Sequence, residues 1–555
     1  MIHTTRSNQL GNIVFAAVFV LVVIGLPVAY FVESSGPITV NALASDNWSI
    51  LPMVQKLDNP SLFKYDQFLY SLHMPSLYIP AFTHGVLVCA KLVQHNIMQG
   101  YNLFNAITVF LHLALWFLAL YRFTKNKWLA LLFALLMRGI LWPPGNEIWG
   151  AGPLQYFLPR TVFSSLLPLF FIAFHYLWQR NFKWVPVSFL LLGMVGNFHP
   201  ISAMGNGMAA IGAAGVLVLL QGKGWRTAIT TVLLCGIAFS IGIGPYVYNH
   251  LSNDVSQAGL TYDKNLLTSL VRYRINPGFS NPWLLYSRYI QPQWFLLIAG
   301  SYVLSYFFRK QAVAPLALIR FLWLFGGFIL AAPLVFYGLE QLAHALGYTY
   351  INYSFELSRT GKYIIIPAFL LYAIGIQGLL HTYLPAASQQ KWPALAVPVF
   401  IAVCWLAMGP LRQWPVLKAD FFRAQLPEAV TGYTYLPYQY AHLDSALAFI
   451  KANTPEDATF LGEPQIRGGS LRSVPYDHKG ASVLLTYEKP KYIEWALKRK
   501  VEISIKDPQE KVNFFRSLGT DYMLTDYLYS NTDSLVYQNQ QYRLYKMIRR
   551  EPQQP

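Results

Sequence analysis

The sequence predicts an α-helical polytopic membrane protein that carries a C-terminal soluble α/β domain. Of its 555 residues, 54% are hydrophobic and only 12% are charged, whereas soluble proteins average about 25% charged residues. Long apolar runs recur through residues 1–411 and stop near residue 412. We therefore expect a transmembrane domain at 1–411 and an α/β domain at 412–555, and exclude a purely soluble enzyme and a disordered chain.

Apolar runs mark the candidate membrane spans, and we expect about 11–13 transmembrane helices. The run 12–32 is too long for the core of a signal peptide, so it is predicted to be an uncleaved first span. The run 76–94 contains Pro80, His84 and Lys91 and is predicted either not to cross or to enter and leave the membrane on the same face. The remaining runs are 102–121, 128–142, 161–178, 185–201, 204–220, 227–246, 291–308, 317–337, 363–380 and 394–411.

The basic residues indicate which connections face the cytoplasm. Residues 1–411 hold 23 Lys and Arg against nine Asp and Glu, whereas the tail is nearly balanced at 19 against 16. The positive-inside tendency places the connectors 122–127, 179–183, 221–226 and 309–310 in the cytoplasm, and therefore the N-terminus inside and the tail outside. The basic excess indicates contact with membrane lipids, and no nucleic-acid partner is expected because the tail carries no basic cluster.

Helical and alternating patterns predict the elements of the tail. Helices are expected at 443–453, 489–499 and 508–518, the last capped by Asp507. Strands are expected at 458–462, 521–525, 534–537 and 541–547, with the last two paired as a hairpin.

The first loop, residues 33–75, is the segment with the most candidate functional residues. Asp46 follows the first span and precedes a stretch in which apolar residues recur at near-helical spacing from Trp48 to Leu57. This spacing predicts a helix lying in the membrane interface. Asp46 could act as a catalytic carboxylate at the membrane surface or could only cap that helix. Residues 264–275 are predicted to form a second interfacial helix that anchors to lipid.

The layout and several short motifs resemble the GT-C superfamily of membrane glycosyltransferases, closest to uncharacterised bacterial members. The layout is a first span, an early carboxylate, an interfacial helix, many spans and an extracytoplasmic α/β tail. The matching motifs are the run from Asp46 to Phe68, Pro159-Arg160 and Phe198-His199-Pro200, with Ala446 to Asp457 and Tyr542 to Tyr545 in the tail. An acidic pair in the first loop would be a firmer match, whereas this chain has the single acid of Ser45-Asp46-Asn47.

The resemblance implies transfer of a sugar from a polyprenyl-phosphate donor to a glycan, lipid or protein acceptor on the outer face of the bacterial inner membrane. Asp46 matches the catalytic acid of the superfamily. Arg160, Arg359 and Lys362 are candidates to stabilise the carrier phosphate, because each lies near the outer end of a predicted span. No cofactor is expected, and the role of a divalent metal stays open.

Three further residues are candidate substrate-binding groups, each with a structural alternative. Arg138 lies near the outer end of its run and either contacts substrate or extends to the lipid headgroups. Glu147 is a possible second acid, although an ordinary solvated loop acid is favoured. His199 lies where an apolar run breaks and the chain turns back, and it is favoured as a hydrogen-bonded structural histidine. The histidines lack metal-ligand spacing, so no metal site is predicted.

Two other classes of function remain open. A transporter or flippase of a lipid-linked solute usually shows repeated halves, which this sequence lacks. A non-catalytic envelope assembly protein would fit the single acid of the first loop. The large loops and the tail on one side of the membrane favour the enzyme.

Overall fold

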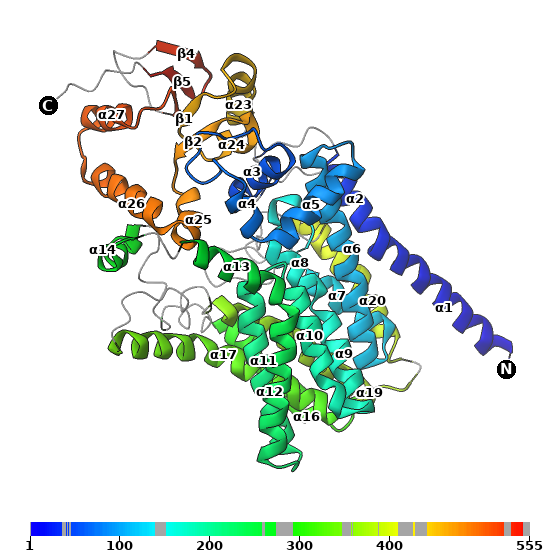
Figure 1. Cartoon of the computed structure of the whole chain (residues 1–555). Helices are drawn as coiled ribbons and strands as arrows, with labels where there is room; N and C mark the ends of the chain where they lie inside the picture. The colour runs from blue at the N-terminus through cyan, green and yellow to red at the C-terminus, as the bar shows by residue number, and fades with distance from the viewer. Residues whose placement is uncertain are drawn as a thin grey trace.

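The computed structural model describes residues 2–35, 40, 43, 46–138, 151–257, 261–273, 283, 292–346, 357, 359–386, 388–408, 426–427, 441–526 and 534–547. Figure 1 shows a bundle of helices with a smaller module of helices and strands, residues 441–526 and 534–547, at one end. We call this smaller part the C-terminal module. Helices α3 (Asn47–Asp58) and α4 (His73–Leu77) lie between the module and the bundle.

Within the part of the chain described, seven helices are long and apolar enough to cross a membrane. They are Gly11–Glu33, Ile97–Thr124, Pro159–Arg180, Pro200–Leu220, Trp225–Gly242, Leu316–Ala343 and Thr360–Tyr383. Three further apolar helices are shorter: Phe182–Gly196, Phe295–Phe308 and Lys391–Ala407. A helical multi-pass membrane protein is thereby confirmed. The number of crossings and their orientation stay predictions.

The bundle is built from the following helices. They are α1 (Ile2–Val20), η1 (Leu21–Gly25), α2 (Leu26–Glu33), α5 (Pro80–Leu92), α6 (Ile97–Thr124), α7 (Lys127–Arg138), α8 (Pro159–Leu166), α9 (Pro168–Arg180), α10 (Val185–Gly196), α11 (Pro200–Leu220), α12 (Trp225–Gly242), α13 (Gly244–Gln257), α16 (Pro292–Phe308), α17 (Leu316–Ala345), η7 (Arg359–Ile364), α19 (Ile365–Tyr383) and α20 (Lys391–Met408).

The run 76–94 forms the short helix α5, which begins at Pro80 after a left-handed residue, Ile79 (φ 47°). Its 13 residues span about 20 Å, whereas the hydrocarbon core of a bilayer is about 30 Å thick. The helix is therefore too short to cross by itself. It packs closely on α6, where a Cβ added to Gly100 would lie 2.7 Å from the backbone nitrogen of Ala90.

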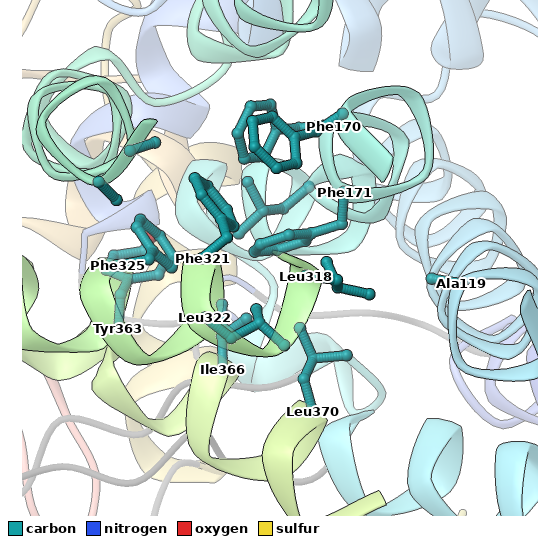
Figure 2. Packing of buried hydrophobic residues seen from close by; sticks show 14 of the residues in the cluster. Ala119, Phe170, Phe171, Leu318, Phe321, Leu322, Phe325, Tyr363, Ile366 and Leu370 are labelled. Atoms are coloured by element: carbon teal, nitrogen blue, oxygen red, sulfur yellow. The ribbon is translucent and has the colours of Figure 1, made fainter. Parts of the chain in front are cut away.

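Close packing joins the helices of the bundle. Figure 2 shows phenylalanines of α9 meeting those of α17, and the rings of Phe174 and Phe321 stack at 4.0 Å between centroids. Helices α10 and α12 approach through Gly193 and Gly242, where an added Cβ would lie 2.3 Å from a backbone oxygen of the facing helix. Because lipid is as apolar as these side chains, helix association in a membrane depends on such packing.

The C-terminal module contains a five-stranded sheet of order β2-β1-β3-β5-β4. Strand β1 pairs in parallel with β2 and β3, and β5 pairs antiparallel with β3 and β4. The predicted hairpin at the end of the chain is therefore confirmed. The strands are β1 (Thr459–Leu461), β2 (Ser473–Tyr476), β3 (Tyr522–Thr525), β4 (Ser534–Gln538) and β5 (Arg543–Lys546).

Three helices of the module match the sequence prediction: α23 (Ala441–Asn453), α26 (Lys489–Ser504) and α27 (Pro508–Ser517). The Asp507 carboxylate accepts from the backbone N–H of Glu510 at 2.9 Å and caps α27 as predicted. The sequence prediction missed α24 (Gln465–Ser470), β2 and α25 (Gly480–Tyr487). Strand β2 contains Pro475, and it is an edge strand of the sheet, where proline is tolerated.

The predicted helix of the first loop is present as α3, but its apolar face does not lie in lipid. Ile50, Leu51 and Val54 are almost completely buried. Leu51 contacts the module, since a Cβ added to Gly468 of α24 would lie 2.8 Å from its side chain. Ile50, Leu51 and Val54 also share a buried cluster with Phe82 of α5 and Tyr101 of α6. The predicted helix is therefore present, but the bundle and the C-terminal module cover its apolar face, where lipid was expected.

The second predicted interfacial helix also contacts the module. It forms α14 (Lys264–Leu270) followed by η5 (Val271–Tyr273), and Figure 1 places α14 beside α26. Leu267 and Leu270 are buried in one cluster with residues of the module, and the Tyr492 hydroxyl donates to the carbonyl of Leu270 at 3.1 Å. The apolar face of α14 is used for docking instead of lipid anchoring.

A buried ion triad, formed by Asp66, Arg467 and Asp477, joins the first loop to the module. Arg467 Nε lies 2.6 Å from Asp66 Oδ2, and Arg467 Nη1 donates to Asp477 Oδ2. All three side chains have 0–1% of their surface exposed. Asp66 also accepts from the backbone N–H of Val474 at 2.8 Å, and the Arg467 guanidinium lies 4.7 Å from the centroid of the Phe68 ring. Loop and module are therefore held in one fixed arrangement.

Replacing Arg467 by Met removes the cation and leaves two carboxylates buried side by side. Removing one partner of a buried ion pair typically costs about 3–5 kcal/mol. We expect Arg467→Met to release the module from the first loop, measured as faster limited proteolysis and earlier thermal unfolding in detergent. Lys498→Met is the matched control, because Lys498 is exposed and forms an ion pair with Glu494, one helical turn away in the same helix. Equal protease resistance of the two variants would contradict a docking role for the triad.

Candidate active site

Asp46 occupies the N-cap position of α3, but its side chain does not cap the helix. Its carboxylate is about half exposed (49%) and lies between two cations. Asp46 Oδ2 is 3.8 Å from Arg160 Nη1, and Asp46 Oδ1 is 3.5 Å from Lys479 Nζ. Of the two interpretations that the sequence left open, a pure helix cap does not describe this side chain.

Arg160 comes from the first turn of α8, where Pro159 fixes the helix start. Its side chain is only 13% exposed, so its guanidinium has little freedom. The buried amide of Asn47 donates to the carbonyl of Phe157 at 2.6 Å. This bond ties the start of α3 to the chain just before α8, and thereby sets Asp46 opposite Arg160.

Lys479 comes from the C-terminal module, at the N-cap of α25. The Asp477 carboxylate accepts from the backbone N–H of Lys479 at 2.5 Å and from that of Gly480 at 2.9 Å. A Cβ at position 480 would lie 2.5 Å from the Phe68 ring, so only glycine fits there. Lys479 was not predicted as a site residue from the sequence. The aspartate in Asp477-His478-Lys479-Gly480 is a helix-start signal that would have placed Lys479 at the beginning of a helix.

His199 is the N-cap residue of α11. Its Nδ1 accepts from the backbone N–H of Ser202 at 3.3 Å and lies 2.7 Å from the Ser202 hydroxyl. This is the structural role that the sequence favoured. His199 caps the helix that begins at Pro200, which explains why a polar residue stands at this break in the apolar sequence.

Lys362 and Arg359 both belong to η7. Lys362 is buried, with 6% of its surface exposed. The neighbouring Tyr363 packs on Phe163 of α8 at 5.8 Å between ring centroids, so η7 contacts the helix that carries Arg160. The backbone of Arg359 begins η7, and its side chain lies outside the described residues.

Arg138 ends α7 and is 1% exposed, so its side chain does not extend to lipid headgroups. Its Nη1 donates to the Tyr30 hydroxyl at 2.8 Å and lies 3.4 Å from the carbonyl oxygen of Ala151. Arg138 therefore ties the end of the first span to the neighbouring bundle helices. Glu147 lies outside the described residues.

The described residues hold no group of three or more His, Cys, Asp or Glu side chains that could bind a metal ion. What they bring together at α3, α8 and α25 is one half-exposed carboxylate with a cation on each oxygen. A carboxylate can accept a proton from a hydroxyl group, and the two cations can bind an anion.

No protein-family model matches this chain, and the search of the curated proteins finds no significant match.

Asp46→Asn should leave the fold intact, because ion pairs of half-exposed groups contribute only about 0–1 kcal/mol. The matched comparison is Asp66→Asn, the same exchange at a carboxylate with no exposed surface in the ion triad. We expect the apparent melting temperature in detergent to be unchanged for Asp46→Asn and clearly lower for Asp66→Asn. A large loss of stability in Asp46→Asn would assign Asp46 a structural role.

Proposed function

We propose that this chain is an integral-membrane glycosyltransferase that moves a sugar from a polyprenyl-phosphate carrier to an acceptor hydroxyl on the outer face of the bacterial inner membrane. The observation that carries the proposal is the contact of Asp46 with Arg160, whose side chains are 49% and 13% exposed. A solvent-facing carboxylate can serve as the base of this reaction, and a neighbouring guanidinium can stabilise the phosphate that leaves. The layout and motifs that resemble GT-C enzymes add to that support.

In the proposed reaction the oxygen of the acceptor hydroxyl attacks the anomeric carbon of the sugar, and Asp46 accepts the proton of that hydroxyl. The bond between that carbon and the carrier phosphate oxygen breaks, and its electron pair leaves with the phosphate. Arg160 lies where it can compensate the negative charge that develops on this leaving group. Asp46 ends protonated, the acceptor carries the sugar, and the carrier is released as a polyprenyl phosphate.

The proposal includes a position and partners for the protein. The C-terminal module lies on the periplasmic side, so that Asp46 faces a lipid-linked donor at the outer surface. Membrane lipids surround the bundle, and the donor enters from the bilayer. The acceptor is a glycan, lipid or protein that carries a free hydroxyl group.

Turnover tests the proposed role of Asp46. In proteoliposomes supplied with a panel of undecaprenyl-phosphate sugars and an envelope extract as acceptor, we expect the wild-type chain to release undecaprenyl phosphate. Asp46→Asn should lower this rate at least about 100-fold, the scale of general-base catalysis. Asp58→Asn is the control, since Asp58 lies in the same loop and pairs with His95 at 3.8 Å. An Asp46→Asn enzyme as active as Asp58→Asn would refute the role, and no turnover with any donor would favour an assembly function.

The proposed orientation is testable by cysteine labelling, because Cys89, Cys235 and Cys404 are all buried. A cysteine in place of exposed Lys498 should react with a membrane-impermeant maleimide in right-side-out vesicles. A cysteine in place of exposed Lys223, in the connection between α11 and α12, should react only in inverted vesicles. The reverse pattern would place the module in the cytoplasm and exclude the proposed donor.

A further inference from the structure

The two cations beside Asp46 come from different parts of the chain. Arg160 belongs to the helical bundle, and Lys479 belongs to the C-terminal module, more than three hundred residues later. Each approaches a different oxygen of the carboxylate, at 3.8 Å and 3.5 Å. The site is therefore shared between bundle and module.

Lys479 has a backbone that is anchored where the module meets the first loop. Its side chain is 28% exposed, and its backbone N–H is bound by Asp477, which is a member of the ion triad. Gln67 of the first loop donates to the carbonyl of Asp477 at 3.1 Å. The same contacts that dock the module on the first loop thus place the Lys479 ammonium beside Asp46.

We propose that Lys479 and Arg160 together bind the phosphate of the lipid-linked substrate, so that the C-terminal module completes the binding site. This inference rests on the proposed function and adds a residue and a module to it. The shared chemistry is a phosphate group at the membrane surface, and the source to which we assign it is the polyprenyl carrier. Charged hydrogen-bond donors on two sides of a phosphate bind it more strongly and in one orientation.

The charges of the site fit the proposed reaction. Before transfer, Arg160, Lys479 and ionised Asp46 sum to +1, which balances the single negative charge of a sugar phosphodiester. After transfer, Asp46 is protonated and the two cations face the more negative phosphate monoester of the carrier. Transfer of the acceptor proton to Asp46 therefore removes the negative charge that attracts both cations, at the moment when the charge of the product phosphate increases.

Phosphate binding can be measured without sugar transfer. We would place the full-length protein in nanodiscs of phosphatidylcholine and titrate three probes separately: undecaprenyl phosphate, phosphatidylglycerol and inorganic phosphate. Lys479→Gln should weaken undecaprenyl phosphate binding about tenfold, because one charged hydrogen bond is lost. Lys479→Arg should keep most of the affinity. Lys498→Gln, the same exchange at an exposed lysine of the module, should have no effect.

Two outcomes would overturn the inference. If Lys479→Gln binds undecaprenyl phosphate as tightly as wild type while Arg160→Gln binds it weakly, the module does not contribute to the site, and the proposed function survives. If Lys479→Gln weakens phosphatidylglycerol or inorganic phosphate equally, the site is not specific for a polyprenyl carrier. Thermal unfolding of each variant shows that a lost affinity reflects the site and not the fold.

Discussion

The arrangement of this protein depends on the ion pairs that the Arg467 guanidinium forms with two carboxylates. The guanidinium is completely buried between Asp66 of the first loop and Asp477 of the C-terminal module. Taking three charges out of water is costly, and such groups often add little net stability. Their effect is positional, because any other placement of the module would leave a buried charge without its partner. The placement of the module and of Lys479 on the first loop depends on this contact, whereas the bond from Asn47 to Phe157 sets Asp46 opposite Arg160.

The first loop serves as the docking surface for the module. Besides Asp66, the Gln55 amide donates to the Gly468 carbonyl of the module at 3.0 Å. Within the loop itself, Lys56 Nζ donates to the carbonyls of Pro60 and Leu62 at 2.7 and 2.6 Å. Burial lowers the pKa of Lys56, whereas the Asp66 carboxylate opposes that shift. The Asp-Asn-Pro-Ser-Leu run that contributes to the GT-C resemblance therefore lies in a segment whose described contacts are structural. The candidate chemistry lies at the other end of α3.

Much of the architecture could be predicted from local patterns, and the rest depends on contacts distant in the chain. Apolar runs predicted the membrane-protein character, and helix caps and alternating patterns predicted most helices and strands of the module. The spacing from Trp48 to Leu57 gave a helix but not its environment, because a lipid surface and a protein surface select the same amphipathic pattern. Lys479 was missed because α24 and β2 are short, and the Pro475 in β2 resembles a turn signal. The hydrogen bond from Arg138 to Tyr30 joins residues 108 positions apart, so no local sequence pattern predicts it.

A carboxylate and two cations lie where the helical bundle, the first loop and the module meet, and we propose that they bind a lipid-linked phosphate. A cryo-EM map of the full-length protein in nanodiscs with undecaprenyl phosphate tests this placement most directly. We expect density for the phosphate within hydrogen-bonding distance of Arg160, beside Asp46, with the polyprenyl chain running along the apolar helices. Carrier density at the opposite end of the bundle, or an Asp46 carboxylate closed off from both solvent and lipid, would contradict this placement.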